Sequence, residues 1–251
     1  MKIKNILVSQ PKPADLEKSP YFPLIQEYKL KMDFKKFIKI EGVKSKEFRQ
    51  KKIRIQDYTA IILSSRNAVD HFFRLSKELR VDIPDTMKYF CTSESTAYYL
   101  QKYVQYRKRK IFHGNQSMAQ LIEVINKHKD EKFLFPTSGN GKKSLMVLLE
   151  KEKIKYTAAE MYKTLPSDLT KLDIKKYDLM ILFSPTGVES LLSNFPDYEQ
   201  GETLIASFGP TTKKAIIENN LRLDIDAPTK TAPSMTMAIE QFLAENKKQK
   251  K

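Results

Sequence analysis

The sequence predicts an α/β fold built from two similar domains, each with a parallel sheet. Short runs rich in β-branched and aromatic residues alternate with stretches of helical periodicity, a pattern typical of parallel sheets covered by helices. One strand-to-helix corner also occurs twice in the chain. The 251 residues, 41% of them hydrophobic, are enough to form two small cores.

Six runs are expected to be strands, because each is short and apolar and ends in turn residues. In chain order they are residues 4–9, 58–65, 87–92, 132–136, 178–184 and 203–209. Helical stretches follow most of them. In residues 67–79 the apolar side chains Val69, Phe72, Phe73 and Leu79 fall on one side, which predicts a helix packed against a core.

The repeated corner reads "SSRNAV" at residues 64–69 and "FSPTGV" at residues 183–188. A second pair, "YFCTSESTAYYL" at residues 89–100 and "ASFGPTTKKAI" at residues 206–216, also leads from a strand through a polar turn into a helix. Nearly the same interval separates Ser65 from Ser184 and Thr96 from Thr212. Two matched corners in the same order predict two similar α/β units.

These corners supply hydrogen-bond donors. The first turn of a helix leaves backbone N–H groups unpaired, which attract anions, and Ser and Thr hydroxyls add further donors. The ends of parallel strands gather at one edge of a sheet. Four corners, at residues 64–68, 92–96, 184–187 and 209–212, are therefore expected to line a cleft suited to carboxylates or phosphates. Simple N-capping of each helix remains the alternative interpretation.

The formal net charge of +15 suits a negatively charged partner. Part of it lies in "YRKRK" at residues 106–110 and in the tail at residues 245–251, and such runs are often only solvated surface. A basic nucleic-acid-binding module stays open as an alternative, with Tyr98, Tyr99, Tyr103 and Tyr106 available for stacking on bases. No zinc-finger or RNA-binding aromatic signature accompanies these residues.

Neither a disulfide nor a metal centre is expected. Cys91 is the single cysteine, and the three histidines, His71, His113 and His128, are not spaced as metal ligands. No apolar run is long enough to span a bilayer, and the N-terminus lacks the features of a signal peptide. We therefore expect a cytoplasmic protein with no contact to a membrane.

Residues 135–144, "FPTSGNGKKS", resemble a phosphate-binding loop but do not fit its spacing. Pro136 stands where that signature needs glycine, and Lys143 stands where it needs serine or threonine. ATP is therefore not expected as a ligand.

The ordered set of motifs resembles the uroporphyrinogen-III synthase family over nearly the whole chain. The stretches that carry the resemblance are "YTAIILSSRNAVDHFF", "MKYFCTSESTAYYL", "KFLFPTSGNGKKSLMVLL", "AAEMYKTLPSD", "ILFSPTGVESLL", "IASFGPTTKKAI" and "LRLDIDAPTKTAPSMTMAI". "FGPTT" at residues 208–212 is the most specific of these motifs.

The resemblance implies two α/β domains with a cleft between them. Residues 39–164 would form an inserted domain, and residues 1–38 together with 165–251 would form the other. The stretches at residues 31–40 and 157–168 would be the two strands that cross between the domains.

The resemblance also implies a function, which is a lyase reaction of tetrapyrrole and heme biosynthesis. The substrate would be hydroxymethylbilane, a linear tetrapyrrole with carboxylates on every ring. A monomeric enzyme without a cofactor would close it to uroporphyrinogen III, with inversion of the last ring and loss of water. Positioning of the substrate should then matter more than acid catalysis.

The family pattern assigns roles to individual residues. Tyr162, in "MYKT", is the candidate proton donor, and Thr96 would line the cleft. The remaining positions would contact substrate carboxylates or shape a turn: Ser65, Ser184, Thr186, Thr211 and Thr212 as contacts, and Gly209 and Pro210 in the turn.

Two arginines of the family pattern are missing from this chain. Ser9-Gln10-Pro11 follows the first strand where the family has an arginine, and Thr137-Ser138-Gly139 stands where Arg-Gly is common. A catalytically inactive relative that only binds its ligand is therefore a further alternative.

Overall fold

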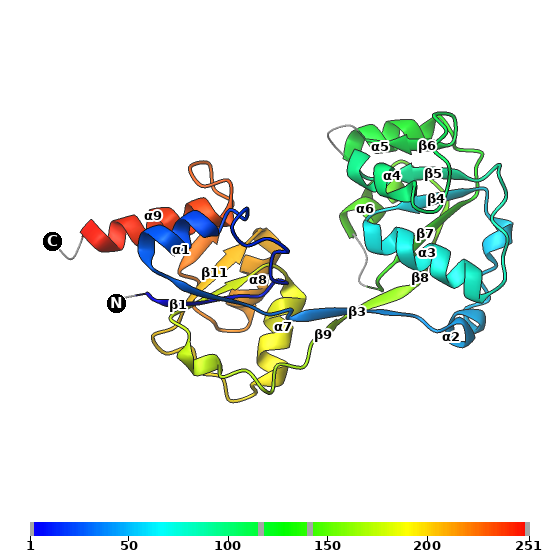
Figure 1. Cartoon of the computed structure of the whole chain (residues 1–251). Helices are drawn as coiled ribbons and strands as arrows, with labels where there is room; N and C mark the ends of the chain where they lie inside the picture. Colours follow the sequence, from blue (N-terminus) through cyan, green and yellow to red (C-terminus); the bar gives the residue numbers. More distant parts are fainter. Residues whose placement is uncertain (1–2, 115–117, 140–142, 249–251) are drawn as a thin grey trace. The chain divides into compact units, whose positions relative to one another are not determined.

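The computed structural model describes residues 3–114, 118–139 and 143–248 (Figure 1). The chain divides into two compact units. Unit 1 consists of Met1–Lys39 and Leu165–Lys251, and unit 2 consists of Ile40–Thr164. Each unit contains a five-stranded parallel sheet with helices, so the predicted α/β class with parallel sheets is confirmed.

The sheet of unit 2 has the strand order β6-β5-β4-β7-β8. Its strands are β4 (Ala60–Leu63), β5 (Lys88–Cys91), β6 (Ile111–His113), β7 (Phe133–Thr137) and β8 (Tyr156–Glu160). Its helices are α2 (Ser45–Gln50), α3 (Arg66–Glu78), α4 (Glu94–Leu100), α5 (Met118–Asn126) and α6 (Lys143–Lys151), with a 3₁₀ turn at Ile55–Asp57.

Both faces of this sheet are buried, as the continuous apolar run of β4 predicts. Ile61 and Leu63 pack with residues of α2, α3 and α4 in one cluster. Ala60 and Ile62 point to the other face and pack with α5 and α6. The predicted core position Phe72 is fully buried.

The sheet of unit 1 has the strand order β12-β11-β10-β1-β2. Its strands are β1 (Asn5–Val8), β2 (Lys31–Phe34), β10 (Leu179–Leu182), β11 (Leu204–Phe208) and β12 (Ile225–Ala227). Helices α1 (Phe22–Tyr28) and α9 (Met235–Lys248) cover one face, and α7 (Pro185–Asn194) and α8 (Pro210–Glu218) cover the other. A 3₁₀ turn occupies Ile174–Lys176.

The two sheets have the same spatial order but a different chain order. Strands β4, β5 and β6 occupy the places that β10, β11 and β12 occupy in unit 1. Strands β7 and β8 take the places of β1 and β2, which come from the beginning of the chain. The units are therefore circular permutants of one arrangement, which explains why the repeated corners recur at a nearly constant interval.

Two strands, β3 (Ile38–Gly42) and β9 (Tyr162–Pro166), pair with each other where the chain passes between the units. The sequence analysis expected one continuous crossing strand at residues 31–40 and another at residues 157–168, and both expected strands are longer than the observed ones. Each stretch holds two strands, and the first of each, β2 or β8, is an edge strand of a five-stranded sheet.

Residues 39–164 expressed alone are expected to give a folded α/β domain. All five strands of its sheet and both of its hydrophobic clusters come from this segment, so it holds the core that a domain needs. Circular dichroism and the dispersion of amide proton NMR signals measure this. An unfolded fragment beside a folded full-length chain would contradict the prediction.

Candidate functional site

The predicted serine and threonine site residues follow the carboxyl ends of strands in the two five-stranded sheets, in which all strand pairs are parallel. Ser65 caps α3 in unit 2 and accepts the Ala68 N–H at 3.2 Å. Ser184 caps α7 in unit 1 and accepts the Gly187 N–H at 3.1 Å. The two serines therefore hold equivalent positions in the two units, each after the central strand of its sheet.

The threonines of the second pair of corners are also equivalent. Thr96 is the third residue of α4 and Thr212 is the third residue of α8. Both are buried, with exposed fractions of 4% and 1%. The caps before them differ: Ser93 bonds to the Thr96 Oγ1 at 3.0 Å, whereas Gly209 precedes α8 with a φ of 93°.

Glycine at this cap is explained by its positive φ, which side-chain-bearing residues adopt at a cost. Pro210 then occupies the first position of α8, where no backbone N–H is required. Thr186 and Thr211 are the second residues of α7 and α8, and Thr211 is exposed. The helix starts of unit 1 therefore present backbone and hydroxyl donors at one edge of its sheet.

Lys213 supplies a positive charge beside this corner of unit 1. Its Nζ lies 2.7 Å from the Asp226 Oδ2, and both side chains are partly exposed. The buried Ser207 hydroxyl donates to the other carboxylate oxygen of Asp226 at 3.3 Å. Asp226 thus holds the lysine in place next to the donors of α8.

In unit 2 the fold brings Tyr162 and Ser65 together. Tyr162 begins β9, and its side chain is 6% exposed. Its hydroxyl oxygen lies 3.5 Å from the Ser65 Oγ. Because this Oγ already accepts the Ala68 N–H, the serine O–H can donate to the phenol oxygen. The phenol then keeps its own proton for another acceptor.

Two residues of α3 to which the sequence analysis gave no catalytic role lie around Tyr162. The His71 ring stacks on the Tyr162 ring, with 5.0 Å between centroids and 15° between the planes. Arg74 donates from Nε to the His71 Nδ1 at 3.1 Å and from Nη1 to Glu78 at 2.6 Å. Burial, followed by the charge of Arg74, lowers the pKa of His71 below its ordinary value.

Arg74 also fixes the backbone next to Tyr162. Its Nη2 donates to the carbonyl oxygens of Val43 at 2.9 Å and Met161 at 3.1 Å. Gly42 leaves room for the guanidinium, since a Cβ at this position would lie 2.6 Å from the Arg74 Cζ. One side chain of α3 therefore ties the helix to the residue that follows β3 and to the residue that precedes β9.

The two stretches that lack the arginines of the family pattern follow strands at equivalent places. Ser9 follows β1 and Thr137 ends β7, and these strands hold the same place in their sheets. Both side chains are buried, at 8% and 5% exposed. Gln10 and Ser138, the residues that come next, are half-buried and uncharged, so neither stretch supplies a charged group to its edge of the sheet.

Among residues 3–114, 118–139 and 143–248, no group of three or more His, Cys, Asp or Glu side chains could hold a metal ion. Cys91 is buried, and burial raises the pKa of its thiol to about 12. Within the same residues no helix is both long and apolar enough to cross a bilayer.

Comparison with known proteins decides the family. A family model described as uroporphyrinogen-III synthase HemD matches residues 25–237. The chain belongs to the uroporphyrinogen-III synthase family. The predicted family is thereby confirmed, and with it an enzyme of tetrapyrrole biosynthesis.

Solved structures of the uroporphyrinogen-III synthase family share this fold. The enzyme from Helicobacter pylori 26695 superposes with a TM-score of 0.62 at 16% identity, covering 97% of this chain and 100% of that one. A mutant enzyme from the extremely thermophilic bacterium Thermus thermophilus gives a TM-score of 0.55 at 13% identity, covering 98% and 99%. A search of curated protein sequences found no significant match.

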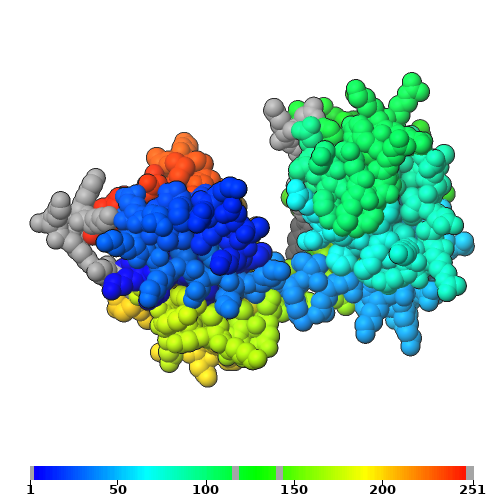
Figure 2. All heavy atoms as spheres, in the orientation of Figure 1, coloured from blue at the N-terminus to red at the C-terminus, as the bar shows by residue number. Residues whose placement is uncertain are grey.

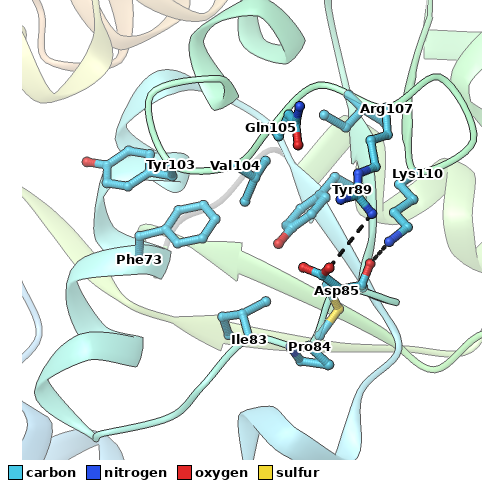
Figure 3. A pocket seen from close by; sticks show the side chains of 12 residues that line it. Phe73, Ile83, Pro84, Asp85, Tyr89, Tyr103, Val104, Gln105, Arg107 and Lys110 are labelled. Atoms are coloured by element: carbon cyan, nitrogen blue, oxygen red, sulfur yellow. Dashed lines mark hydrogen bonds and ion pairs between the residues drawn. The ribbon is translucent and has the colours of Figure 1, made fainter.

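A pocket of about 360 Å³ lies in unit 2 away from the site residues that the uroporphyrinogen-III synthase family predicts. Its lining includes residues at the amino ends of β5 and β6. This edge of the sheet is opposite the edge at which Ser65 lies. Figure 3 shows its aromatic wall of Phe73, Tyr89 and Tyr103, with Arg107 directed at Asp85. None of the predicted site residues lines it.

The basic run at residues 106–110 adjoins this pocket, and Arg107, Lys108 and Arg109 are exposed. Figure 2 shows the green part of the chain, which includes the run, on the surface of unit 2. Replacing these three residues with glutamine is expected to leave ring closure nearly unchanged, because they lie at the opposite edge from Tyr162.

Turnover and binding to single-stranded RNA and DNA, measured at several salt concentrations, test this expectation. A nucleic-acid site would lose affinity and salt dependence together in the triple variant, because each phosphate contact releases counterions. Strong, salt-dependent nucleic-acid binding that disappears in the variant, without any turnover in the parent chain, would favour the alternative function.

Proposed function

We propose that this chain closes hydroxymethylbilane to uroporphyrinogen III, with inversion of the last ring and loss of water. The proposal includes a monomeric enzyme in the cytoplasm that needs no cofactor. The observation that carries it is the contact of Tyr162 with Ser65 at the carboxyl edge of a sheet, in a chain of the uroporphyrinogen-III synthase family.

The helix starts of each unit are the proposed contacts for substrate carboxylates. Unpaired N–H groups in the first turns of α3, α7 and α8 carry partial positive charge. They can therefore bind a substrate carboxylate even where no arginine is present. Thr186, Thr211 and Thr212 add hydroxyl donors in unit 1. Ser65 and Thr96 would do so in unit 2, where the Thr92 hydroxyl links the two corners by donating to the Ser64 carbonyl at 3.1 Å.

The reaction requires the terminal hydroxyl to leave as water. In the proposed step the Tyr162 O–H donates its proton to this hydroxyl while the C–O bond breaks. The Ser65 O–H, which lies 3.5 Å from the phenol oxygen, would stabilise the developing phenolate. The pyrrole nitrogen supplies electrons to the cationic carbon, so the acid needs only moderate strength.

Conversion of hydroxymethylbilane, with isomer analysis of the product, tests the proposal directly. Uroporphyrinogen III as the main product, formed at a rate proportional to protein concentration, is the expected result. A product with the last ring not inverted, formed at the rate seen without protein, would show that the chain is an inactive relative. Binding of the bilane measured in parallel would then separate a ligand-binding protein from one with no affinity.

A further inference from the structure

We propose that His71, held by Arg74, is a positioning residue for the Tyr162 hydroxyl. This inference rests on the proposed function, in which Tyr162 donates a proton to the leaving hydroxyl. His71 itself would not touch the substrate. It would act through the ring that it stacks on.

The first step of the argument is that the Tyr162 backbone is fixed on one side. The carbonyl oxygen of the preceding Met161 accepts the Val43 N–H at 3.0 Å and the Arg74 Nη2–H at 3.1 Å. Met161 is fully buried. The Cα of Tyr162 is thus anchored, and the orientation of its buried side chain then depends on the groups packed against the ring.

The second step is that His71 restricts rotation of this side chain. Its ring lies nearly parallel to the phenol ring, at 15°, with 5.0 Å between the centroids. Rotation of the phenol would break this stacking and move its hydroxyl away from the Ser65 Oγ at 3.5 Å. A stacked pair of this kind contributes beyond its buried area, so it favours one orientation of the hydroxyl.

The third step is that Arg74 fixes His71 in turn. Its Nε donates to the His71 Nδ1 at 3.1 Å, so this nitrogen carries no proton and the imidazole is neutral. The carboxylate of Glu78 holds the guanidinium from the other side at 2.6 Å. The charged groups that act on His71 are Arg74, which disfavours its protonation, and Asp70 and Glu78, which favour it.

The test is a set of four enzymes assayed on hydroxymethylbilane: the parent chain, His71→Leu, Tyr162→Phe and the double variant. His71→Leu keeps the bulk but removes the ring, and it is expected to lower kcat about tenfold with little change in KM. In the Tyr162→Phe background the same change should have almost no further effect on kcat, because the hydroxyl it positions is gone. His71→Phe, which restores a flat ring, should recover part of the loss.

A matched control comes from the same helix. Phe73 stacks on Tyr103 with 4.5 Å between centroids and 4° between planes, and it lies on the opposite side of α3 from His71, because two residues turn a helix by roughly 200°. Phe73→Leu should therefore weaken packing to a similar extent without changing kcat. An equal loss of kcat from His71→Leu in both backgrounds would show a structural role only, and no loss in the parent chain would also overturn the proposal.

A measurement without substrate separates this inference from the proposed function. With ¹³C-labelled tyrosine, the Tyr162 ring signals are assigned from their absence in Tyr162→Phe. They should shift in His71→Leu and stay in place in Phe73→Leu. Unchanged Tyr162 signals in His71→Leu would refute the positioning role, whereas shifted signals in a chain that converts no bilane would refute only the proposed function.

Discussion

Replacing Tyr162 with phenylalanine is expected to slow ring closure about 100-fold, the lower end of what general acid catalysis contributes. The substitution removes only the hydroxyl that lies 3.5 Å from the Ser65 Oγ. The ring keeps its buried place against His71, so fold and ligand affinity should change little. Single-turnover rates with excess enzyme measure the chemical step, and circular dichroism checks the fold.

The comparison variant is Thr212→Val, which removes a proposed carboxylate donor and keeps the shape of a side chain that is 1% exposed. It should raise KM more than it lowers kcat, because the contact would be present in both the bound and the transition state. If Tyr162→Phe turned over as fast as the parent chain while chemistry limits the rate, Tyr162 would not be the proton donor.

Replacing Phe72 with alanine is expected to destabilise unit 2 by about 3–5 kcal/mol, the usual cost of removing a buried aromatic ring. Phe72 is fully buried in the cluster between α3 and its sheet. It also meets Phe73 edge to face, with ring centroids 5.0 Å apart. Hydrogen exchange read by mass spectrometry should show faster exchange across the strands of unit 2.

Unit 1 offers a matched control at the equivalent place on α7. Leu191 follows its cap Ser184 by the same number of residues as Phe72 follows Ser65, and it is also fully buried. Leu191→Ala is expected to cost about 2–5 kcal/mol and to speed exchange in unit 1 alone. If it loosened the strands of unit 2 as strongly, the two units would not be separate cooperative structures.

The corners were predictable because the signals that make them are local. A buried apolar strand followed by Ser or Thr three residues before a helical N–H specifies a cap by itself, and Ser65 and Ser184 make these bonds. The short strands were not predictable in this way. β6 and β12 have three residues each, which is too few to show alternation.

The strand boundaries at residues 31–40 were missed for a related reason. The stretch "KMDFKKFIKI" alternates on both sides of a short interruption at residues 35–38, and neither glycine nor proline marks the break between β2 and β3. The break is made by the fold, because β2 joins the sheet beside β1, whereas β3 pairs with β9.

The group around Tyr162 depends on contacts between distant segments. His71 and Arg74 stand one helical turn apart in the sequence, but nothing local shows that β9 brings Tyr162 against them. One signal was available: Gly42 ends a strand pattern, where glycine often marks the close approach of another group. In the structure that group is the Arg74 guanidinium.

The permuted order of unit 1 has a consequence for the order of folding. Asn5, at the start of β1, donates its backbone N–H to Asp178, which lies 173 positions later, so β1 cannot pair with β10 until most of the chain has been synthesised. Unit 2 is complete much earlier. Once folded, it holds Val43 against Met161 by a backbone hydrogen bond of 3.0 Å. The residues between Val43 and Met161 then no longer add to the length of the flexible loop that unit 1 must close.

This shortening lowers the entropy that unit 1 must lose to close its sheet, by roughly 1–2 kcal/mol for a loop reduced several-fold in length. Folding of unit 1 is therefore expected to depend on unit 2, and not the reverse. Until β10 emerges from the ribosome, the apolar residues Ile6, Leu7 and Val8 of β1 can pair only with the edge strand β2, and this part of the nascent chain is exposed to aggregation.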